Sequence, residues 1–232
     1  MASVWCMFST KGGVGKTTVT ALLAGEIIRL GGTVTVIDTD QNQPLALWAE
    51  KGNLPDGIKV VSDHDDSGRT ILKLIDEAKA QSDFVLIDTE GSENIRAAYA
   101  AQAADYVIVP MQFSELDLVE ARKVSTFLDG IERATQKKRC HAILPTRVGS
   151  AIISNRQRSI LKDLEALSLD VISPGVIDKE VYRLLFTHGC TLRDVSTMAK
   201  VHGLDTAEEN AAAVLDALAA NYSTQRDKIQ NG

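Results

Sequence analysis

Cysteine and aromatic residues are scarce in this chain of 232 residues, and it contains no long hydrophobic run. The three cysteines, Cys6, Cys140 and Cys190, are widely spaced and form no C-x-x-C pair, which argues against a disulfide framework, a zinc site or a redox dithiol. We expect small buried thiols instead. No segment approaches the roughly 20 apolar residues that a membrane-spanning helix requires, and residues 1–5 lack the pattern of a signal peptide. The composition therefore predicts a cytoplasmic protein without membrane contact.

Charge is unevenly distributed along the chain. The formal net charge of -6 argues only weakly against a nucleic-acid partner. Residues 133–162 contain eight Lys or Arg and no Asp or Glu, and the distribution of charge matters more for binding than its sum. This segment favours an anionic partner. The alternative is an ordinary charged face in contact with water.

The hydrophobic pattern predicts one α/β domain, because 44% of the residues are hydrophobic and 24% are charged, enough for a sizeable core. Short hydrophobic runs alternate with longer helical patterns, which is typical of βαβ units in a parallel sheet. The predicted strands are residues 3–8, 33–38, 58–61, 84–88, 106–110, 141–145 and 170–172. The predicted helices are residues 16–30, 44–51, 69–80, 93–103, 114–134, 154–167, 179–187 and 206–222. We predict a single doubly wound, mostly parallel sheet with helices on both faces, over residues 1–222, and a frayed polar tail over residues 223–232.

The segment Ser9–Thr18 has the features of a phosphate-binding loop. It follows a predicted strand and precedes a predicted helix, and its glycines let successive backbone N–H groups point at phosphate oxygens beside the helix N-terminus. We predict that Lys16 reaches the β- and γ-phosphates, that the Thr17 hydroxyl ligates Mg²⁺, and that Thr18 lies near the α-phosphate. The other predicted nucleotide-binding residues of the loop are Gly12, Gly13, Val14 and Gly15.

A second lysine, Lys11, distinguishes this loop from the standard pattern G-x-x-x-x-G-K-[ST], which would place glycine at position 10. The sequence K-G-G-x-G-K-[ST] at residues 11–17 resembles the deviant Walker A motif of the ParA/MinD ATPases. The resemblance implies Mg²⁺-dependent hydrolysis of ATP to ADP by a homodimer in which Lys11 reaches the nucleotide of the other subunit. Such a cation would act like an arginine finger. The alternative is a solvated loop lysine.

The predicted strand 33–38 ends in Asp38, and Asp40 follows two residues later, at the sheet edge where ligands of open α/β folds bind. The family pattern at this place is D-x-D-P-Q. The resemblance implies that Asp40 orients the attacking water and that Asp38 lies near the Mg²⁺ hydration shell. This chain lacks the proline after the second acid. For each residue the alternative is an acid that merely ends a strand.

Another strand, residues 84–88, ends in Asp88 and has the form of a Walker B motif. We predict that Asp88 holds an Mg²⁺-bound water. By resemblance, the amide of Gly91 senses the γ-phosphate, although Glu90 departs from the family pattern. The segments 107–110 and 114–117 are similar to the corresponding strand and helix start of small ParA/ParF-type partition ATPases. Resemblance also assigns the adenine base to Thr146, Arg147 and Pro174.

Function within this family depends on the cargo, because its members share one chemistry. The resemblance to small partition ATPases implies an ATP-bound dimer that binds DNA non-specifically through phosphate contacts, is associated with the nucleoid and works with a ParB-like centromere-binding adaptor. The predicted DNA-contacting residues are Arg156, Arg158, Lys179 and Arg183.

Other functions stay open at this point. MinD-like membrane positioning would need a C-terminal amphipathic anchor, and the alanine-rich segment 211–220 is a poor one. An iron–sulfur role is disfavoured because no cysteine lies between Asp88 and Cys140. Lys11 argues against a ligase related to dethiobiotin synthetase. Recruitment of DNA for conjugative transfer, or positioning of another cargo, is compatible with every motif above.

Overall fold

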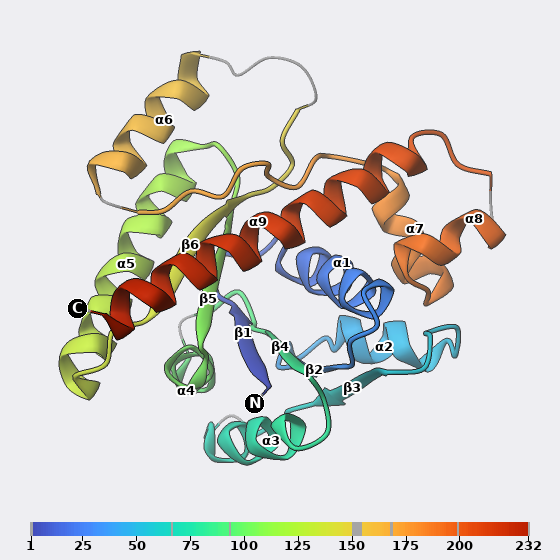
Figure 1. The fold of residues 1–232 in the computed structure, drawn as a ribbon, viewed down its shortest axis with the longest axis horizontal. Coiled ribbons are helices and arrows are strands. Elements are labelled where there is room, and N and C mark those ends of the chain that lie inside the picture. Colours follow the sequence, from blue (N-terminus) through green and yellow to red (C-terminus); the bar gives the residue numbers. More distant parts are fainter. Residues whose placement is uncertain are drawn as a thin grey trace.

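The computed structural model describes residues 2–231 except residues 66, 93, 150–154, 168 and 199. Within this part of the chain, six parallel strands form one sheet in the order β3-β2-β4-β1-β5-β6 (Figure 1). The strands are β1 (Ser3–Met7), β2 (Val34–Asp38), β3 (Ile58–Ser62), β4 (Phe84–Asp88), β5 (Tyr106–Met111) and β6 (Cys140–Pro145). The predicted doubly wound α/β fold is confirmed.

Helices cover both faces of the sheet. They are α1 (Lys16–Arg29), α2 (Pro44–Glu50), α3 (Arg69–Lys79), α4 (Ile95–Ala103), α5 (Glu115–Thr135), α6 (Asn155–Ala166), α7 (Val181–His188), α8 (Val195–Met198) and α9 (Leu204–Gln230), with a 3₁₀ turn at Leu192–Asp194. Two hydrophobic clusters show the layers: α1, α2, α7 and α9 pack on one face, and α3 to α6 pack on the other. Figure 1 shows α9 crossing the sheet on the same side as α1.

Strand β1 illustrates why these strands are almost continuously hydrophobic. Trp5 and Met7 point into one cluster, whereas Val4 and Cys6 point into the other. Successive side chains of a strand alternate between the two faces, and both faces are covered here. A polar residue in the middle of β1 would therefore be buried whichever way it pointed.

The register of the central strands brings their carboxyl ends together. Asp88 at the end of β4 is paired with Met7 at the end of β1 and with Asp38 at the end of β2. Parallel strands in register finish at the same edge, so the segment between β1 and α1 lies beside two carboxylates. This edge is where open α/β folds bind ligands.

The chain end differs from the prediction. Helix α9 continues to Gln230, so the expectation of a frayed tail after residue 222 is wrong. Gln225 holds this last part against the edge strand: its side chain accepts a hydrogen bond from His141 N at 3.0 Å and donates one to His141 O at 2.8 Å. Tyr222 packs against Trp5 and Tyr106. These contacts extend a helix that its polar sequence alone does not predict.

Other elements differ less from the expectation. The predicted strand 170–172 contributes only an isolated bridge between Val171 and Ile143. Helix α7 begins at Val181 rather than at residue 179, and the short helix α8 was not predicted. All three cysteines are unpaired and buried, as expected. In the described part of the chain, no helix is both long enough and apolar enough to cross a membrane.

Candidate nucleotide-binding site

The loop between β1 and α1 has the backbone shape that its glycines predict. Gly13 has φ 75° and Gly15 has φ 100°, in the left-handed region that a side chain with a Cβ disfavours. Gly15 immediately precedes α1. The chain therefore turns back on itself over the N-terminus of α1, where unpaired backbone N–H groups and the helix dipole favour an anion.

Lys16 lies inside this loop. Its side chain is buried, and Nζ donates hydrogen bonds to the carbonyl oxygens of Lys11 at 3.0 Å and of Ser9 at 3.4 Å. Burial lowers the pKa of Lys16, and the nearby carboxylates of Asp88 and Asp40 partly offset that shift. The ammonium is thus held by neutral carbonyl oxygens at the mouth of the loop. A phosphate group placed there would supply the anionic partner that a desolvated cation lacks.

The predicted magnesium ligands Thr17 and Asp88 are adjacent, with Thr17 Oγ1 donating to Asp88 Oδ2 at 2.7 Å. Burial raises the pKa of Asp88 to about 7, and the charges of Asp38 and Asp40 add to the shift, while the Thr17 hydrogen bond and Lys16 oppose it. Such a buried cluster of carboxylates favours a cation. Among the described residues, no group of three or more His, Cys, Asp or Glu could hold a metal ion.

These donors fit Mg²⁺ when a nucleotide is present. A hydroxyl and a carboxylate are the hard oxygen ligands that the ion prefers, and Mg²⁺ normally keeps several waters and shares phosphate oxygens instead of using an all-protein cage. Thr17 and Asp88 would hold the ion directly or through water. The bound ion would neutralise phosphate charge.

Asp38 is engaged differently from the expectation. Its carboxylate is fully buried, and it accepts three backbone hydrogen bonds, from Leu45 at 2.8 Å, Ala46 at 3.1 Å and Asp40 at 3.1 Å. Burial raises the pKa of Asp38, and these hydrogen bonds lower it. We assign to Asp38 the positioning of the loop that carries Asp40 and of the N-terminus of α2, in addition to its electrostatic effect on Asp88.

Asp40 lies at the surface end of the same edge. Its Oδ1 accepts hydrogen bonds from Asn42 N at 2.8 Å and from Asn42 Nδ2 at 3.1 Å. The Asp40 side chain thus accepts from the backbone two residues ahead, as in an Asx turn. Asp40 is partly exposed, so water can reach its carboxylate.

Gly91 lies directly against the phosphate loop. A Cβ at this position would be 2.7 Å from both Cα and N of Gly12. Only a glycine allows the segment after β4 to approach the loop backbone this closely. Gly91 therefore lies in contact with the backbone of the loop.

We expect Gly91→Ala to lower ATP affinity by about tenfold or more and the free energy of unfolding by about 1–3 kcal/mol, because the added methyl group must displace backbone. Titration with a fluorescent ATP analogue and thermal denaturation measure the two effects. Gly130→Ala is the matched control, because nothing lies within 4 Å of a Cβ at this position of α5. It should leave ATP affinity unchanged and stabilise the helix slightly. Normal ATP affinity in Gly91→Ala would contradict this contact.

Lys11 is bound to helix α5 instead of to its own phosphate loop. Its Nζ forms an ion pair at 2.7 Å with Asp117 in the first turn of α5, and Asp117 is buried. Asp117 also accepts a hydrogen bond from Ser114, the N-cap residue of α5. Next to this pair, the Thr10 hydroxyl donates to Glu120. Helix α5 therefore holds the start of the phosphate loop at two successive residues, Thr10 and Lys11.

A pocket of about 250 Å³ adjoins the loop where the base of a nucleotide would lie. Thr146 and Arg147, the residues predicted to contact the base, line this pocket, and Thr146 Oγ1 donates to Val14 O at 2.7 Å. Pro174 does not line the pocket, whereas Val176 and Ile177 from the same segment do. Asn210 of α9 fixes this segment through hydrogen bonds to Ile177 N and Gly175 O.

Sequence reasoning missed the contribution of α7 to this pocket. Tyr182 and Phe186 line it, and the Tyr182 hydroxyl is buried without a hydrogen-bond partner among the described residues. Burial raises the pKa of Tyr182, so the hydroxyl stays a neutral donor. An aromatic wall with an unsatisfied hydroxyl suits a purine base. The sequence signal was the helical pattern of 179–187, which by itself does not say where the helix packs.

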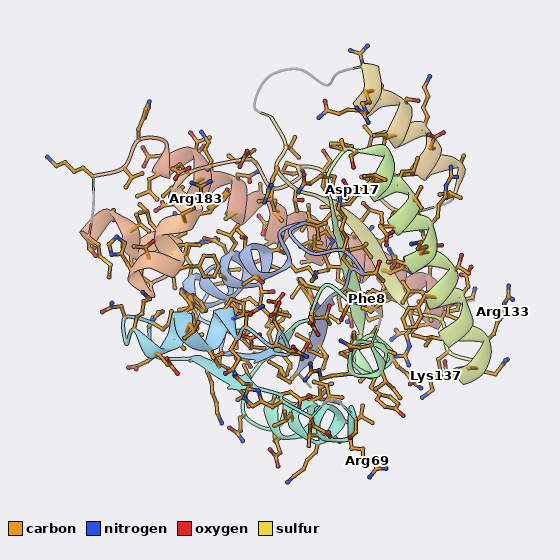
Figure 2. The ribbon with its side chains drawn as sticks, turned by 180° about the vertical axis from the view of Figure 1, so that it is seen from behind. Phe8, Arg69, Asp117, Arg133, Lys137 and Arg183 are labelled. Atoms are coloured by element: carbon orange, nitrogen blue, oxygen red, sulfur yellow. The ribbon has the colours of Figure 1, made fainter. Side chains whose placement is uncertain are left out.

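The four predicted DNA-contacting residues fall into two groups. Arg156 and Arg158 are exposed on α6, whereas Lys179 and Arg183 line the nucleotide pocket near α7. Helices α6 and α7 lie at opposite ends of the molecule in both views (Figures 1 and 2). Arg183 also pairs with Glu180 at 2.9 Å, a contact between exposed side chains that is worth little. One continuous DNA surface through all four residues is therefore not formed within a single chain.

A doubly wound parallel sheet with this two-lysine loop defines a P-loop protein of the deviant Walker A type. The chain matches the family model described as VirC1 protein over residues 1–220. It is 32% identical over 205 residues to the ParA protein of Rhizobium radiobacter, covering 88% of this chain and 90% of that protein. It is also 26% identical over 190 residues to the virC1 protein of Rhizobium rhizogenes, covering 80% of each. The chain belongs to the VirC1 family, within the ParA/MinD-type partition ATPases.

Solved structures share the fold at low identity. The structure of Cyanothece McdA in complex with ATP has a TM-score of 0.71 at 16% identity, covering 94% of this chain and 96% of McdA. The MinD protein of Pyrococcus horikoshii in complex with Mg-ADP has a TM-score of 0.69 at 18% identity, covering 93% of this chain and 95% of MinD. The predicted membership of the ParA/MinD family is confirmed, and the family is one of ATPases with nucleotide-bound and Mg²⁺-bound structural relatives.

Proposed function

We propose that this chain is a Mg²⁺-dependent ATPase that dimerises on binding ATP, binds DNA non-specifically as the dimer, and segregates DNA together with a ParB-like adaptor. Lys16 and the loop amides hold the phosphates, Thr17 and Asp88 hold the ion, and Asp40 orients the attacking water. The base occupies the pocket formed by β6, the 174–178 segment and α7. In the ATP-bound state the protein is cytoplasmic and associated with the nucleoid.

The ion pair between Lys11 and α5 is the observation that most directly supports this proposal. Lys16 already occupies the phosphate loop of its own chain, whereas Lys11 is bound to α5 and is about one third exposed, with a side-chain exposure of 37%. A second cation of the loop that pairs with α5, remains partly exposed and leaves its own phosphate site to Lys16 is suited to a nucleotide on another subunit. A positive charge brought to the γ-phosphate in this way stabilises the charge that develops during transfer. Hydrolysis then depends on dimerisation.

The basic part of the chain supports the DNA role. Arg156, Arg158 and Lys162 of α6 are exposed. Arg133 and Lys137 lie at the C-terminal end of α5, on the side of the molecule away from Arg183 (Figure 2). Helices α5 and α6 pack on the same face of the sheet. Arg133, Lys137, Arg156, Arg158 and Lys162 therefore supply exposed positive charge on or beside two helices of one face, whereas Arg147 of the same segment lines the nucleotide pocket. Exposed basic side chains of this kind suit non-specific phosphate contacts.

We expect the double variant Arg156→Glu/Arg158→Glu to bind DNA at least tenfold more weakly, because each reversal replaces attraction to phosphate by repulsion. ATP-dependent dimerisation should be unchanged. DNA affinity is measured by fluorescence anisotropy of a labelled duplex at several salt concentrations, and the slope of log affinity against log salt should become shallower. The mass of the ATP complex is measured in parallel by light scattering.

Arg69→Glu/Lys73→Glu is the matched control, because it reverses two exposed charges on α3. It should retain wild-type DNA binding. If the α6 variant binds DNA as tightly as the wild type does, the DNA surface lies elsewhere. Loss of DNA binding in both would indicate that net charge alone governs it.

Recruitment of DNA for conjugative transfer is a second candidate, because it would use the same ATP site and the same exposed basic residues. Both functions use the same ATP cycle and differ in the partner. In a host carrying this protein, inactivation of the ATP site by Lys16→Ala should raise plasmid loss if the role is partition. It should lower transfer frequency, with plasmid retention unchanged, if the role is transfer.

A further inference from the structure

Helices α2 and α7 connect the base pocket to the loop that carries Asp40. They lie side by side on the α1 face of the sheet (Figure 1). Phe186 of α7 lines the base pocket. It also lines a second cavity of about 610 Å³, whose other lining residues belong to α2 and to Lys51 directly after it. One side chain of α7 therefore adjoins both the base pocket and α2.

The carboxyl end of α7 is capped by side chains of α2 and of the residues that follow α2. The last carbonyl oxygens of a helix have no partner within the helix, and a cation near them complements the helix dipole. Hydrogen bonds to backbone oxygens at this end run from Trp48 Nε1 to Cys190 at 3.0 Å, from Lys51 Nζ to Thr187 at 3.0 Å and from Asn53 Nδ2 to His188 at 2.8 Å. We call these hydrogen bonds the α2 caps.

Gly189 brings the two segments into direct contact. It ends α7 with φ 64°. A Cβ at this position would lie 2.3 Å from Cβ of Lys51 and 2.7 Å from the carbonyl oxygen of Trp48. Closely packed atoms transmit a displacement to their neighbours because there is no free space to absorb it. A shift of α7 is therefore passed on to α2.

The other end of α2 is tied to the Asp40 loop. The carboxylate of Asp38 accepts hydrogen bonds from Leu45 N and Ala46 N in the first turn of α2, and from Asp40 N. Three residues separate Asp40 from Pro44, the first residue of α2. A displacement of about 1 Å at a reacting group can lower a rate by about 100-fold. The position of α2 therefore affects how Asp40 holds the attacking water.

We propose that α2 and α7 form a positioning unit that makes hydrolysis, and not only binding, depend on the base of the nucleotide. A base packed against Tyr182 and Phe186 fixes α7, the α2 caps fix α2 to α7, and α2 fixes the loop of Asp40. A triphosphate without a base is held by the phosphate loop and yet is hydrolysed slowly. This inference rests on the proposed ATPase and on the proposed position of the base.

The main experiment compares saturating ATP with saturating ribose 5-triphosphate, which has the same phosphates and no base. In the wild type, kcat for ribose 5-triphosphate should be at least about tenfold lower than kcat for ATP. Each exposed cap is weak by itself, so two are removed together in Lys51→Met/Asn53→Ala. In this variant kcat for ATP should fall at least about fivefold, kcat for ribose 5-triphosphate should stay the same, and KM for ATP should change less than about threefold.

Two further variants separate positioning from stability. Lys51→Arg retains a charged donor and should keep the wild-type ratio of the two kcat values. Lys59→Ala is the matched control, because it removes an exposed lysine whose Nζ donates to Gln81 Oε1 at 2.7 Å, away from α2 and α7. It should also keep the wild-type ratio. A merely structural role of the α2 caps would lower the melting temperature and both rates together, and the ratio would not change.

The connection from α7 to α2 can also be measured without hydrolysis. Because the three native cysteines are buried, Leu47→Cys, at a residue of α2 that is 54% exposed, can be labelled with an environment-sensitive fluorophore. ADP should shift the emission, whereas ribose 5-diphosphate should not. The shift should disappear when Lys51→Met/Asn53→Ala is added. A label at Leu72→Cys of α3, at a residue that is 43% exposed, should give no shift with either ligand.

Three results would overturn this coupling. They are equal kcat values for ATP and ribose 5-triphosphate in the wild type, an unchanged ratio in Lys51→Met/Asn53→Ala, and equal emission shifts with ADP and ribose 5-diphosphate. A chain that hydrolyses ATP and gives any of them keeps its proposed function and loses the coupling. A chain that binds ADP but hydrolyses neither triphosphate loses the proposed function, and the coupling to hydrolysis is lost with it.

Discussion

Lys11→Ala should bind ATP with nearly normal affinity, fail to form the ATP-dependent dimer, and hydrolyse ATP about 10³-fold more slowly than the wild type. The expected loss of rate is at the lower end of what an arginine finger contributes to phosphoryl transfer. Nucleotide affinity is preserved because Lys16, and not Lys11, lies within the phosphate loop of its own chain. ATP binding by fluorescence, mass by light scattering and phosphate release measure the three properties separately.

The loss of an ion pair complicates this variant, because Asp117 is buried and pairs with Lys11. Some loss of stability is expected from the unpaired carboxylate, although Ser114 still donates to it. Asp117→Asn is therefore measured beside Lys11→Ala: it removes the same ion pair and retains the lysine. If Lys11→Ala and Asp117→Asn lose dimerisation equally, then dimerisation requires the Lys11–Asp117 ion pair and not the lysine by itself. If Lys11→Ala dimerises and hydrolyses ATP normally, the proposed action of Lys11 on the other subunit is wrong.

Lys16→Ala should lower ATP affinity by about 100-fold, equivalent to about 2.7 kcal/mol, and reduce hydrolysis to background. The reason is the loss of a charge-assisted hydrogen bond to phosphate. The fold should survive, because the removed ammonium is desolvated and its burial lowers its pKa. Removing the ammonium also removes the desolvation penalty of burying its charge. The melting temperature without ATP should stay within a few degrees of wild type, and the rise in melting temperature on adding ATP and Mg²⁺ should disappear.

Lys11→Ala is also the matched control for this measurement, because it removes the other lysine of the same loop. In the same thermal assay, ATP should still stabilise Lys11→Ala. Stabilisation of Lys16→Ala by ATP to the wild-type extent would mean that the loop around α1 does not grip the triphosphate. If ATP changed the melting temperatures of Lys16→Ala and Lys11→Ala by the same amount, the two lysines would not have separate roles. The proposal that Lys16 acts within its own chain and Lys11 on the other subunit would then be wrong.

The local features of the site could be predicted because each depends on a short stretch of sequence. The left-handed conformations of Gly13 and Gly15 follow from residues that lack a Cβ. Ser114 caps α5 through a hydrogen bond from the backbone three residues ahead. Asp38 and Asp88 meet because hydrophobic strands of equal length end in register at one edge. Spacing along the chain determines all of these, independently of how the helices pack.

Packing between segments far apart in the sequence determined the partner of Lys11, the positions of the basic residues and the length of α9. Lys11 and Asp117 are 106 positions apart, and only the placement of α5 beside the loop makes them partners. Lys179 and Arg183 lie in the nucleotide pocket because α7 packs on the α1 side of the sheet, while Arg156 and Arg158 lie on the opposite side. The last turns of α9 are held by Gln225 against β6. The sequence by itself determined the fold and the phosphate loop through local spacing, whereas the ion pair of Lys11 and the wall of the base pocket depend on long-range contacts that exist only once the helices are packed.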